Sequence, residues 1–540
     1  MRVPRSFFVV LCIGAIVALL AGCGQPATTP TTEPDTDGPS PGGTISMGME
    51  YEPVTLDPHV TGQAIAIRVI RDVIATYIWI EDGVVYPYLA ADIDISDDGL
   101  EYTLTLREDV VFHDGTPLDA NVAKYSFDRI TDPDTMSQSA VSALGPSYNR
   151  TEVVDDYTIR IFLDEPFAPL LTQLSSPVLG PVSPDAVEAL GDDFAKTPVG
   201  AGPFYVERWD EQEKTVLKRF EDFDWAPDVF DHSGPALLDS IEFVYVSEPE
   251  VRISTLRTGE MDLIEVVPML EVADLQADPD FVVYVEPYAG SNVQGLINCQ
   301  KAPTDSLNVR QAILYGVNRE QYVERVRGGV PDIINNIMTS GTWTYDPDVG
   351  SQYIYDPEKA AELLDEDGWI PGSDGIRVKD GQELTLDIFV IDALVEATEN
   401  AQFIQSELLP LGFDVQIQAM ARPAWFEAIT AGEHNMTMAG LWTSEPDRFA
   451  MFYRSDERSP FYWSFLDDPE VNDLFKRGQQ ISDPEEREPI YREIQRRIMD
   501  QAATLPIYES LNIMASRATV KGLRFDLQTY PVYYEVYLTE

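Results

Sequence analysis

Apolar and polar positions alternate with two different periods along the second half of the chain. Short apolar runs of strand length stand between longer segments whose apolar residues recur at helical spacing. The expected strands are residues 384–390, 413–418 and 436–442, and the expected helices between them are 393–409 and 424–430. Strands that alternate with helices are typical of a parallel sheet with helical crossovers, so the pattern predicts an α/β arrangement in this region.

Helices and returning strands flank this alternating region. Asn318 and Gln321 are spaced as a capping pair, and Asp356-Pro357 begins a helix that we expect to stop at Gly368. The expected helices are 309–317, 320–326, 357–368 and 484–502, and the expected returning strands are 505–508 and 512–516.

The first half of the chain mixes strand and helix patterns. Apolar and polar residues alternate over 102–107, as in a half-buried strand. Thr116 is placed to cap a helix that has Pro117 at its first position, and residues 64–79 carry apolar residues at helical spacing. Further strands are expected at 44–49, at 151–163 as a pair around Asp155-Asp156, and at 205–209, 241–246 and 261–266, with a helix at 249–257.

One glycine-rich stretch raises the question of phosphate binding. Gly200-Ala201-Gly202-Pro203-Phe204 contains two glycines, but no Gly-Lys-Ser/Thr follows and Pro203 has no amide donor. We therefore interpret the stretch as a tight turn that leads into a strand.

The N-terminus has the pattern of an export signal. Residues 7–20 carry no charge and follow Arg2 and Arg5, and small residues come next. This apolar run is shorter than the ~20 residues that cross a bilayer, so we expect residues 1–22 to be a secretory signal peptide. Residues 24–43 are rich in Pro, Thr, Gly and Asp without apolar periodicity, which predicts a flexible linker.

Length and cysteine content limit the architecture. Of the 540 residues, about 500 follow the signal and linker, which suggests two or three domains. Cys12 lies in the signal and Cys23 at its end, so Cys299 is alone in the body and no internal disulfide is expected. We interpret Cys299 as a small buried apolar residue.

The charge balance is strongly acidic, with 37 basic and 92 acidic residues and a net charge of −55. Such a surface repels phosphate backbones, which excludes nucleic-acid binding. A saline habitat is one explanation, and an acidic protein from an ordinary habitat is the alternative.

The end of the apolar run adds a second feature to the signal. Leu20-Ala21-Gly22-Cys23 resembles the bacterial lipobox, whose cysteine is lipidated and becomes the mature N-terminus. The resemblance implies that Cys23 carries lipid, that residues 23–43 form the lipidated cysteine and linker, and that the body works outside the cytoplasmic membrane on a tether. An ordinary signal peptide with a chance cysteine is the alternative.

The body resembles family 5 of the extracytoplasmic solute-binding proteins, the peptide/nickel-binding proteins of ABC importers. Short blocks over nearly all of residues 44–540 carry the resemblance, in the family's order. They are 98–107, 111–118, 200–204, 256–262, 309–313 with Asn318-Arg319, 355–360, Arg487 with Tyr491, and 505–508.

The resemblance implies an α/β fold with two lobes around a ligand cleft, like periplasmic binding proteins. The first lobe would comprise 44–290, with an extra mixed α+β subdomain at about 60–195, and the second 291–505. Residues 506–540 would return to the first lobe. The lobes would close around ligand through two crossing segments, near 292–298 and 504–508.

The resemblance also places candidate ligand-binding residues. In peptide-binding members an acidic residue soon after a Trp, on a loop that ends a strand of the second lobe, pairs with the ligand's α-amine. Trp442, Glu445 and Asp447 lie on the matching loop, where Glu445 stands in place of the usual Asp and the loop is shorter. The alternative is that Glu445 is a solvated loop charge.

Further aromatic and basic residues are expected near the cleft. These are Trp343, Tyr345 and Trp425, each of which has core packing as its alternative. Arg422 is placed to meet a ligand carboxylate, with a structural ion pair as its alternative.

Other kinds of site find little support in the sequence. The four histidines lack metal-ligand spacing, no nucleotide or cofactor motif is present, and no catalytic motif of a hydrolase appears. We therefore expect a monomeric, lipid-anchored binding protein that is not an enzyme. It would capture peptides or similar small polar solutes for a permease with separate ATPase subunits. An oligosaccharide binder and a secreted hydrolase that uses two carboxylates remain the alternatives.

Overall fold

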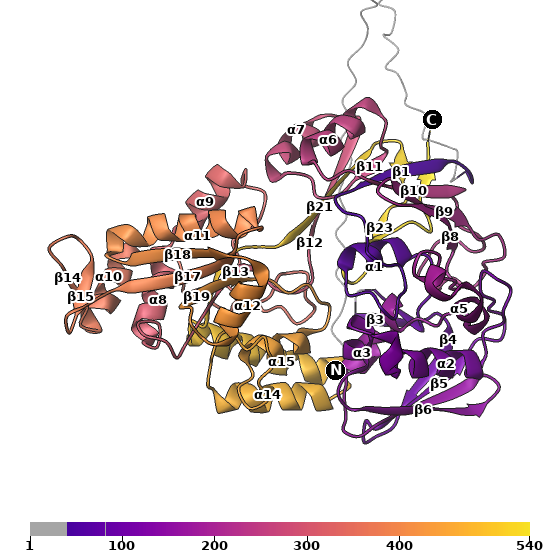
Figure 1. Ribbon diagram of the computed structural model, residues 1–540, viewed down its shortest axis with the longest axis horizontal. Helices are drawn as coiled ribbons and strands as arrows, with labels where there is room; N and C mark the ends of the chain where they lie inside the picture. The colour runs from indigo at the N-terminus through magenta and orange to yellow at the C-terminus, as the bar shows by residue number, and fades with distance from the viewer. Residues whose placement is uncertain (1–39, 82, 540) are drawn as a thin grey trace, which may run out of the picture. The chain divides into compact units, whose positions relative to one another are not determined.

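The computed structural model describes residues 40–81 and 83–539. A seven-stranded sheet has the strand order β12-β21-β11-β1-β10-β9-β8. These strands are β1 (Thr44–Met49), β8 (Phe204–Asp210), β9 (Lys214–Arg219), β10 (Ser240–Tyr245), β11 (Leu263–Ile264), β12 (Phe281–Pro287) and β21 (Leu511–Arg517). We refer to the part of the chain built on this sheet as lobe I (Figure 1).

A five-stranded sheet, with the order β18-β17-β19-β13-β20, forms the centre of lobe II. Its strands are β13 (Val293–Ile297), β17 (Thr385–Ile391), β18 (Asp414–Met420), β19 (Met436–Ala439) and β20 (Thr504–Tyr508). β17 pairs in parallel with β18 and with β19, and helices α11 (Val395–Leu408) and α12 (Arg422–Thr430) connect these strands. The parallel crossover arrangement predicted from the alternating pattern is therefore confirmed.

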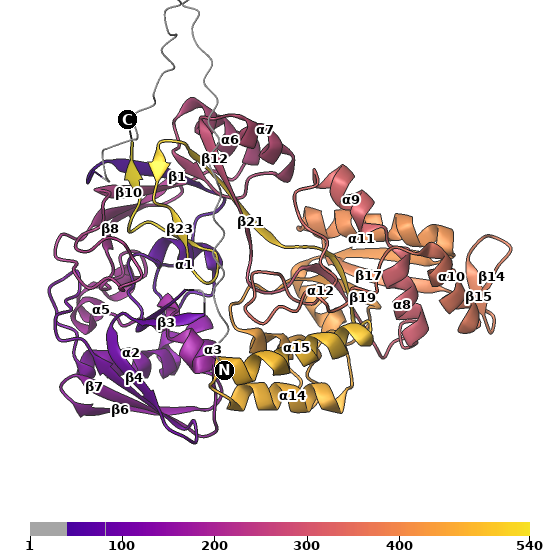
Figure 2. The same cartoon turned by 180° about the vertical axis from the view of Figure 1, so that it is seen from behind.

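The polypeptide passes between the two sheets at two places. β12 of lobe I continues through residues 288–292 into β13 of lobe II, and β20 of lobe II continues through 509–510 into β21 of lobe I. Both crossings are strand-to-strand connections, and Figures 1 and 2 show them between the two sheets. The expected domain boundaries near residues 290 and 505 lie at these crossings and stay a prediction.

Lobe I also carries a four-stranded antiparallel sheet, with the order β4-β5-β7-β6. These strands are β4 (Ala90–Ile95), β5 (Glu101–Leu106), β6 (Tyr148–Asp155) and β7 (Thr158–Leu163), and helix α2 (Ala120–Thr131) packs against β6 and β7. We call residues 90–167 the small-sheet region. The predicted strand pair around Asp155-Asp156 is confirmed here.

The other helices and short strands surround these sheets. The helices are α1 (Ala64–Ile70), α3 (Ser139–Leu144), α4 (Pro169–Gln173), α5 (Pro184–Leu190), α6 (Pro249–Thr258), α7 (Val272–Ala277), α8 (Leu307–Gly316), α9 (Arg319–Val326), α10 (Pro357–Glu366), α13 (Ala450–Tyr453), α14 (Pro469–Gln480) and α15 (Pro484–Asp500). The short strands are β2 (Ile78–Glu81), β3 (Val84–Pro87), β14 (Ile370–Pro371), β15 (Arg377–Lys379), β16 (Gln382–Glu383), β22 (Val520–Lys521), β23 (Arg524–Phe525), β24 (Pro531–Val532) and β25 (Tyr537–Leu538).

Several predicted helix limits in the first half are wrong. Helix α1 ends at Ile70 rather than at residue 79, because the chain turns and continues into β2. The helix expected to begin at Thr116-Pro117 begins at Ala120 instead, where the Asp119 carboxylate accepts hydrogen bonds from the amides of Asn121 and Val122. Pro117 forms an isolated bridge with Val111, so this segment is extended.

Caps predicted in the second half are confirmed. The Asn318 side chain accepts a hydrogen bond from the Gln321 amide at 3.1 Å, and the Asp356 side chain accepts one from the Lys359 amide at 2.9 Å. Both bonds satisfy amides that a helix N-terminus leaves without partners, which explains why helices begin at these points.

The predicted turn at 200–204 is a close approach between two backbone segments. A Cβ atom on Gly202 would lie 2.4 Å from the Asp72 carbonyl oxygen, and one on Gly200 would lie 2.3 Å from the Val73 carbonyl oxygen. The Gly202 amide donates to the Val73 carbonyl at 2.9 Å. The glycines therefore let the entry to β8 pack against the segment that follows α1.

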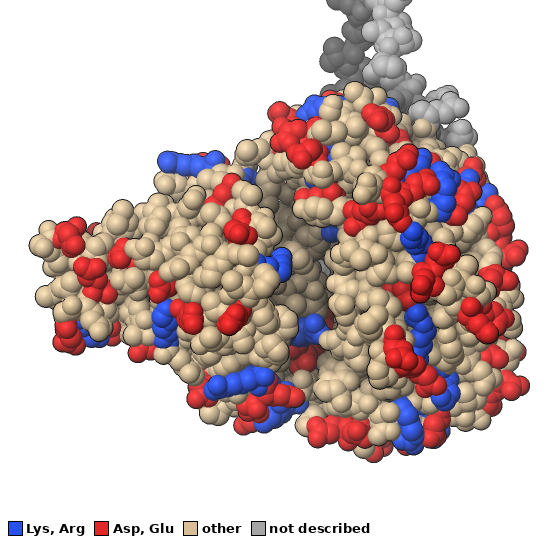
Figure 3. Space-filling view, in the orientation of Figure 1, with Lys and Arg blue, Asp and Glu red and all other residues tan. Residues whose placement is uncertain are grey.

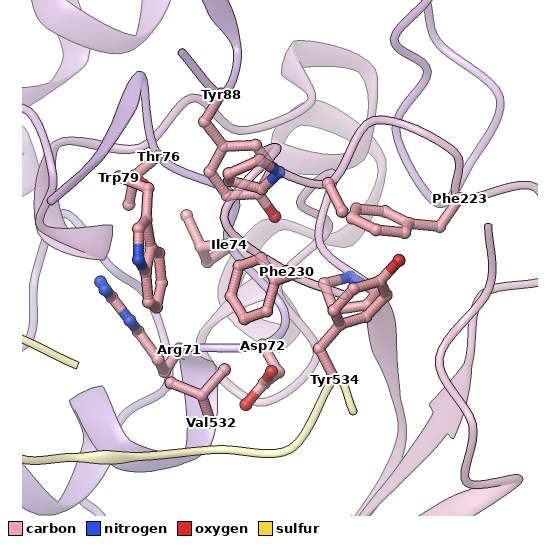
Figure 4. A pocket seen from close by; sticks show the side chains of 13 residues that line it. Arg71, Asp72, Ile74, Thr76, Trp79, Tyr88, Phe223, Phe230, Val532 and Tyr534 are labelled. Carbon is pink, nitrogen blue, oxygen red and sulfur yellow. The ribbon is translucent and has the colours of Figure 1, made fainter. Parts of the chain in front are cut away.

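The C-terminal segment packs into lobe I beside the same place. The Asp72 carboxylate accepts a hydrogen bond from the Tyr533 amide at 3.3 Å, and Arg71 pairs with Asp526 at 3.0 Å. Figure 4 shows Arg71 stacked against Trp79 and Asp72 directed toward the segment that bears Tyr534, around a cavity of only about 20 Å³. Tyr533 and Val536 are fully buried. No helix in the described part of the chain is long and apolar enough to span a membrane.

Candidate functional site

A cavity of about 570 Å³ lies between the two lobes, beside the crossing strands. Lobe I contributes residues of α1 and of the segments after β1 and β11, and lobe II contributes residues from the starts of α11 and β13, the end of β20 and the loop after β19. We call this space the cleft cavity. Figure 3 shows the surface hollowed between the two lobes. Cavities of this size between lobes suit a small molecule.

A charged network forms the lobe I wall of the cleft cavity. Arg68 of α1 makes an ion pair with Glu265 and donates a hydrogen bond to the Tyr288 hydroxyl at 2.6 Å. Burial opposes the charge on Arg68, but the Glu265 carboxylate outweighs this effect and raises the pKa of the guanidinium. The Glu265 carboxylate also accepts from the Glu50 amide at 2.9 Å. The charges of Arg68 and Glu265 therefore balance each other, and their ion pair connects α1 with the segment after β11.

The wall contains a strained backbone position. Val266 has φ of 51°, a left-handed conformation that is rare for β-branched residues. The buried Arg252 side chain donates to the carbonyl groups of Glu265 and Val266, both at 3.2 Å. Strain of this kind persists only where the surroundings enforce it, and it is concentrated at binding sites.

Exposed aromatic and aliphatic side chains border the cleft cavity from both lobes. Trp442 is 59% exposed, and its indole donates to the Ser510 hydroxyl at 3.2 Å. Its ring lies 5.9 Å from that of Tyr288, while Tyr51 is 60% and Leu394 45% exposed. Large exposed apolar groups around a cavity mark a binding surface.

Two carboxylates that make no ion pair with the described residues line the cleft cavity. Glu50 follows β1 in lobe I, and Glu396 lies in the first turn of α11 in lobe II. The Glu396 carboxylate accepts a hydrogen bond from the Tyr508 hydroxyl. Among the described residues neither carboxylate makes an ion pair, whereas Glu265, which also lines the cavity, does. The cavity is thus suited to a ligand with a cationic group and an apolar part.

A second cavity between the lobes, of about 640 Å³, is lined by Trp343. Its charged lining residues are Glu81, Glu485, Glu488 and Asp526. Three of these carboxylates pair with arginines outside the lining: Glu81 with Arg524, Asp526 with Arg71 and Glu488 with Arg492. Among the described residues only Glu485 of this lining makes no ion pair.

Glu445 lies inside lobe II and is fully buried. Its carboxylate pairs with Arg487 at 2.7 Å and accepts a hydrogen bond from the Asp447 amide at 3.2 Å. The alternative that Glu445 is a solvated loop charge is therefore wrong. Its role as amine partner stays a prediction, although both carboxylate oxygens already contact Arg487.

Asp447 belongs to the same buried network. Its carboxylate accepts hydrogen bonds from the Gln479 amide at 3.0 Å and the Tyr491 hydroxyl at 3.3 Å. Burial raises the pKa of Asp447 to about 6, against the opposing effect of the Gln479 hydrogen bond. Asp447 thus connects the loop after β19 with α14 and α15.

The remaining candidates are distributed over different environments. Trp425 is 5% exposed in the lobe II core, where its indole donates to the Thr437 hydroxyl at 3.1 Å, so its expected place near the cleft is wrong. Arg422 is exposed at the start of α12 and makes no ion pair with any described residue, which contradicts the ion-pair alternative. Tyr345 is half-buried. The guanidinium carbon of Arg487 lies over the Trp343 ring, 5.7 Å from its centroid. Their ligand contacts stay predictions.

Sequence reasoning missed the residues that build the cleft cavity. Glu50, Arg68, Glu265 and Glu396 come from four separate segments, and none lies in a motif that marks a ligand. Only the folding of both lobes brings them together. Cys23 lies outside the described residues. In the described ranges no group of three or more His, Cys, Asp and Glu side chains is arranged to hold a metal ion.

Comparison with known families gives a match over most of the chain. The family model described as "Bacterial extracellular solute-binding proteins, family 5 Middle" matches residues 84–462. A glutathione-binding protein, GsiB of Salmonella paratyphi A, is 28% identical over 494 residues, which cover 88% of this chain and 91% of that protein.

Solved structures with similar folds cover nearly the whole chain. The periplasmic binding protein DppA from Helicobacter pylori, in complex with the peptide STSA, has a TM-score of 0.74 and 27% identity and covers 93% of this chain and 99% of its own. NikA from Brucella suis, in complex with Fe(III)-EDTA, has a TM-score of 0.81 at 22% identity and covers 92% of this chain and 100% of its own. The two-lobed fold expected from the sequence is confirmed.

Proposed function

The chain belongs to family 5 of the bacterial extracellular solute-binding proteins, and on this premise we propose that it binds short peptides with a free amino group in the cleft cavity. Proteins of this family are transport binding proteins. The chain is therefore the extracytoplasmic, non-enzymatic component that captures a solute for an ABC importer.

One observation carries the peptide assignment. The carboxylates of Glu50 and Glu396, which make no ion pair with any described residue, line the same interlobe cavity as the exposed ring of Trp442. A carboxylate in a site that closes favours an ammonium group, because charge-assisted hydrogen bonds strengthen when water is excluded. An aromatic surface beside it suits an apolar side chain or the face of a cation. The similarity to proteins named for glutathione and peptide ligands supports the same class.

Isothermal titration calorimetry with di- to pentapeptides and with oligosaccharides tests the ligand class. We expect saturable binding of peptides. The bound peptide should also raise the free energy of unfolding by about 2.7 kcal/mol at a ligand concentration of 100 Kd. Exposed aromatic rings also suit sugars, which keeps the oligosaccharide binder as the rival. Binding of sugars alone would overturn the peptide assignment.

Substitutions test the proposed contacts. Glu396→Gln and Trp442→Ala should each weaken peptide binding by about 1–3 kcal/mol, because one removes a charged partner and the other an aromatic contact. Glu427→Gln is the matched control, since Glu427 is exposed on α12 outside the cleft cavity. N-acetylation of the peptide should weaken binding to the natural chain but add little to Glu396→Gln. Equal losses from acetylation in both proteins would assign the amine to another group.

We also propose a lipid anchor on Cys23 and a monomeric state. The lipobox-like motif supports the anchor, and a tether keeps the binding protein at high local concentration near its permease. Stable anchoring takes two or more acyl chains, so the mature N-terminus should carry several. Mass spectrometry of the membrane-extracted protein should find acyl chains on Cys23, and Cys23→Ala should release the protein from membranes. An unmodified Cys23 would contradict the anchor.

A further inference from the structure

A second contact between the lobes lies away from the crossing strands. The Arg448 guanidinium of lobe II donates to the Ser142 hydroxyl of α3 at 2.5 Å, and the Ala168 amide of lobe I donates to the Gln479 carbonyl at 2.8 Å. Figures 1 and 2 both place α3 beside α14 and α15. Between these contacts is a cavity of about 590 Å³, lined by residues 142–167 from one side and 447–480 from the other. We call it the junction pocket.

The junction pocket concentrates basic residues in a very acidic protein. Of only 37 basic residues in the chain, four line this pocket, namely Arg448, Arg454, Arg458 and Lys476. Its acidic lining residues are Glu165, Asp447 and Glu457. A net basic lining is unexpected by chance where acidic residues outnumber basic ones by 92 to 37.

Two of the four basic residues are neutralised by nearby carboxylates. Arg454 pairs with Asp456 at 3.0 Å and with Glu457 at 2.9 Å, and Lys476 pairs with Asp456 at 2.5 Å. These contacts hold the loop after α13 to α14. Arg448 and Arg458 take no part in these ion pairs.

Arg448 and Arg458 lack carboxylate partners among the described residues. Arg448 is half-buried and reaches only the Ser142 hydroxyl, while Arg458 donates to the Ser455 carbonyl at 3.3 Å and lies 5.3 Å from the Tyr462 ring. Burial lowers the pKa of Arg448, an effect that its neighbour Asp447 only partly offsets. The Asp447 carboxylate is itself occupied by Gln479 and Tyr491. A partly desolvated guanidinium without a carboxylate is costly unless an anion accompanies it.

We propose that the junction pocket binds a small oxyanion, of the carboxylate or phosphate type, through the guanidinium groups of Arg448 and Arg458. Planar guanidinium groups match such anions bidentately. Both guanidinium groups belong to lobe II, and the small-sheet region supplies the facing wall of the pocket. The site is separate from the cleft cavity and shares no lining residue with it.

Titration with sodium sulfate, phosphate and acetate tests the site. Because a chain of net charge −55 responds to any salt, NaCl keeps the ionic strength constant throughout. We expect saturable binding of at least one oxyanion to the natural chain, and about tenfold or greater weakening in both Arg448→Gln and Arg458→Gln. Arg458 is exposed, so its variant should fold even if the Arg448 variant does not.

Arg150→Gln is the matched control, because Arg150 is an exposed arginine of the small-sheet region that pairs with Glu152 at 2.7 Å. It should bind the anion like the natural chain. Absence of saturable binding above the NaCl background would overturn the proposal, and so would unchanged binding in both pocket variants. Neither outcome involves a peptide, so each is distinguishable from failure of the proposed function.

A second experiment distinguishes two sources of the anion, the ligand's own carboxylate and a separate inorganic ion. A peptide ligand is compared with the same peptide amidated at its C-terminus, in the natural chain and in Arg458→Gln. Weakening by amidation in the natural chain alone supports the ligand's own carboxylate as the occupant. If amidation has no effect while sulfate binds, a separate inorganic anion is the occupant.

Discussion

Glu445 and Arg487 form a buried ion pair at 2.7 Å inside lobe II. Arg487 also donates to the Gly478 carbonyl at 2.8 Å, so the pair connects the loop after β19 with α14 and α15. Glu445→Gln should lower the free energy of unfolding by about 3–5 kcal/mol, because it leaves a buried guanidinium without its counter-charge.

Urea denaturation measures this loss, and Glu152→Gln is the control. Glu152 forms an exposed pair with Arg150, which contributes about 0–1 kcal/mol. Equal, small losses in the two variants would contradict the structural role assigned to Glu445. A large loss would also mean that reduced ligand binding by Glu445 variants reports on folding.

Asp72 gives lobe I a pH dependence. Burial raises the pKa of its carboxyl from 3.8 to about 7, although the Tyr533 amide and Arg71 oppose the shift. At a pH between these two pKa values, Asp72 is protonated in the folded state and ionised in the unfolded state. The free energy of unfolding therefore falls as pH rises from about 4 to 7. The contribution is of the order of 4 kcal/mol.

Denaturation of the natural chain and of Asp72→Asn at several pH values checks this prediction. The Asn variant cannot ionise, so its stability should change less between those pH values. Asp447, whose pKa burial raises to about 6, contributes a smaller decline of the same sign in both proteins. Parallel pH profiles for the two proteins would show that Asp72 ionises without cost.

At the scale of elements, the turn before β8 fixes how the entry to β8 packs against the segment that follows α1. Gly202→Ala should destabilise the protein by about 1–3 kcal/mol, since its Cβ would lie 2.4 Å from the Asp72 carbonyl oxygen. Gly440→Ala is the control, because the nearest atom to its Cβ would be 3.9 Å away. Urea midpoints compare the two variants, and equal midpoints would contradict the close approach.

Element limits were predictable where a cap or a turn residue marks them. Asn318 and Asp356 cap their helices as expected. Thr116 was an equally good local candidate, but Asp119 caps α2 because Pro117 is engaged in an extended bridge with Val111. Local sequence proposes several possible starts, and tertiary pairing selects one of them.

At the scale of the whole molecule, the net charge of −55 makes stability depend on salt. Repulsion between acidic groups destabilises the folded state and is screened in about 1 M NaCl, where the Debye length is only ~3 Å. We therefore expect a higher urea midpoint in molar NaCl than in dilute buffer, as for a protein from a saline habitat. Arg448→Gln should show the same rise, since screening is not specific to one site.

A midpoint that is unchanged or lower in molar NaCl would favour the alternative of an acidic protein from an ordinary habitat. The slope of unfolding free energy against urea serves as the internal check. A constant slope shows that salt changes stability rather than the surface exposed on unfolding.

The sequence by itself determined the α/β pattern of lobe II and the family, because periodicity, caps and ordered short blocks are local properties of the chain. Tertiary structure alone decided which residues line the candidate binding surface. Glu445 stands at the position suggested by the family, but its carboxylate binds the guanidinium of Arg487, which is 42 residues away in the sequence. Glu50 and Glu396 face one cavity only because two lobes fold around it. Local pattern specifies elements, whereas burial and charge pairing depend on residues that are distant in sequence.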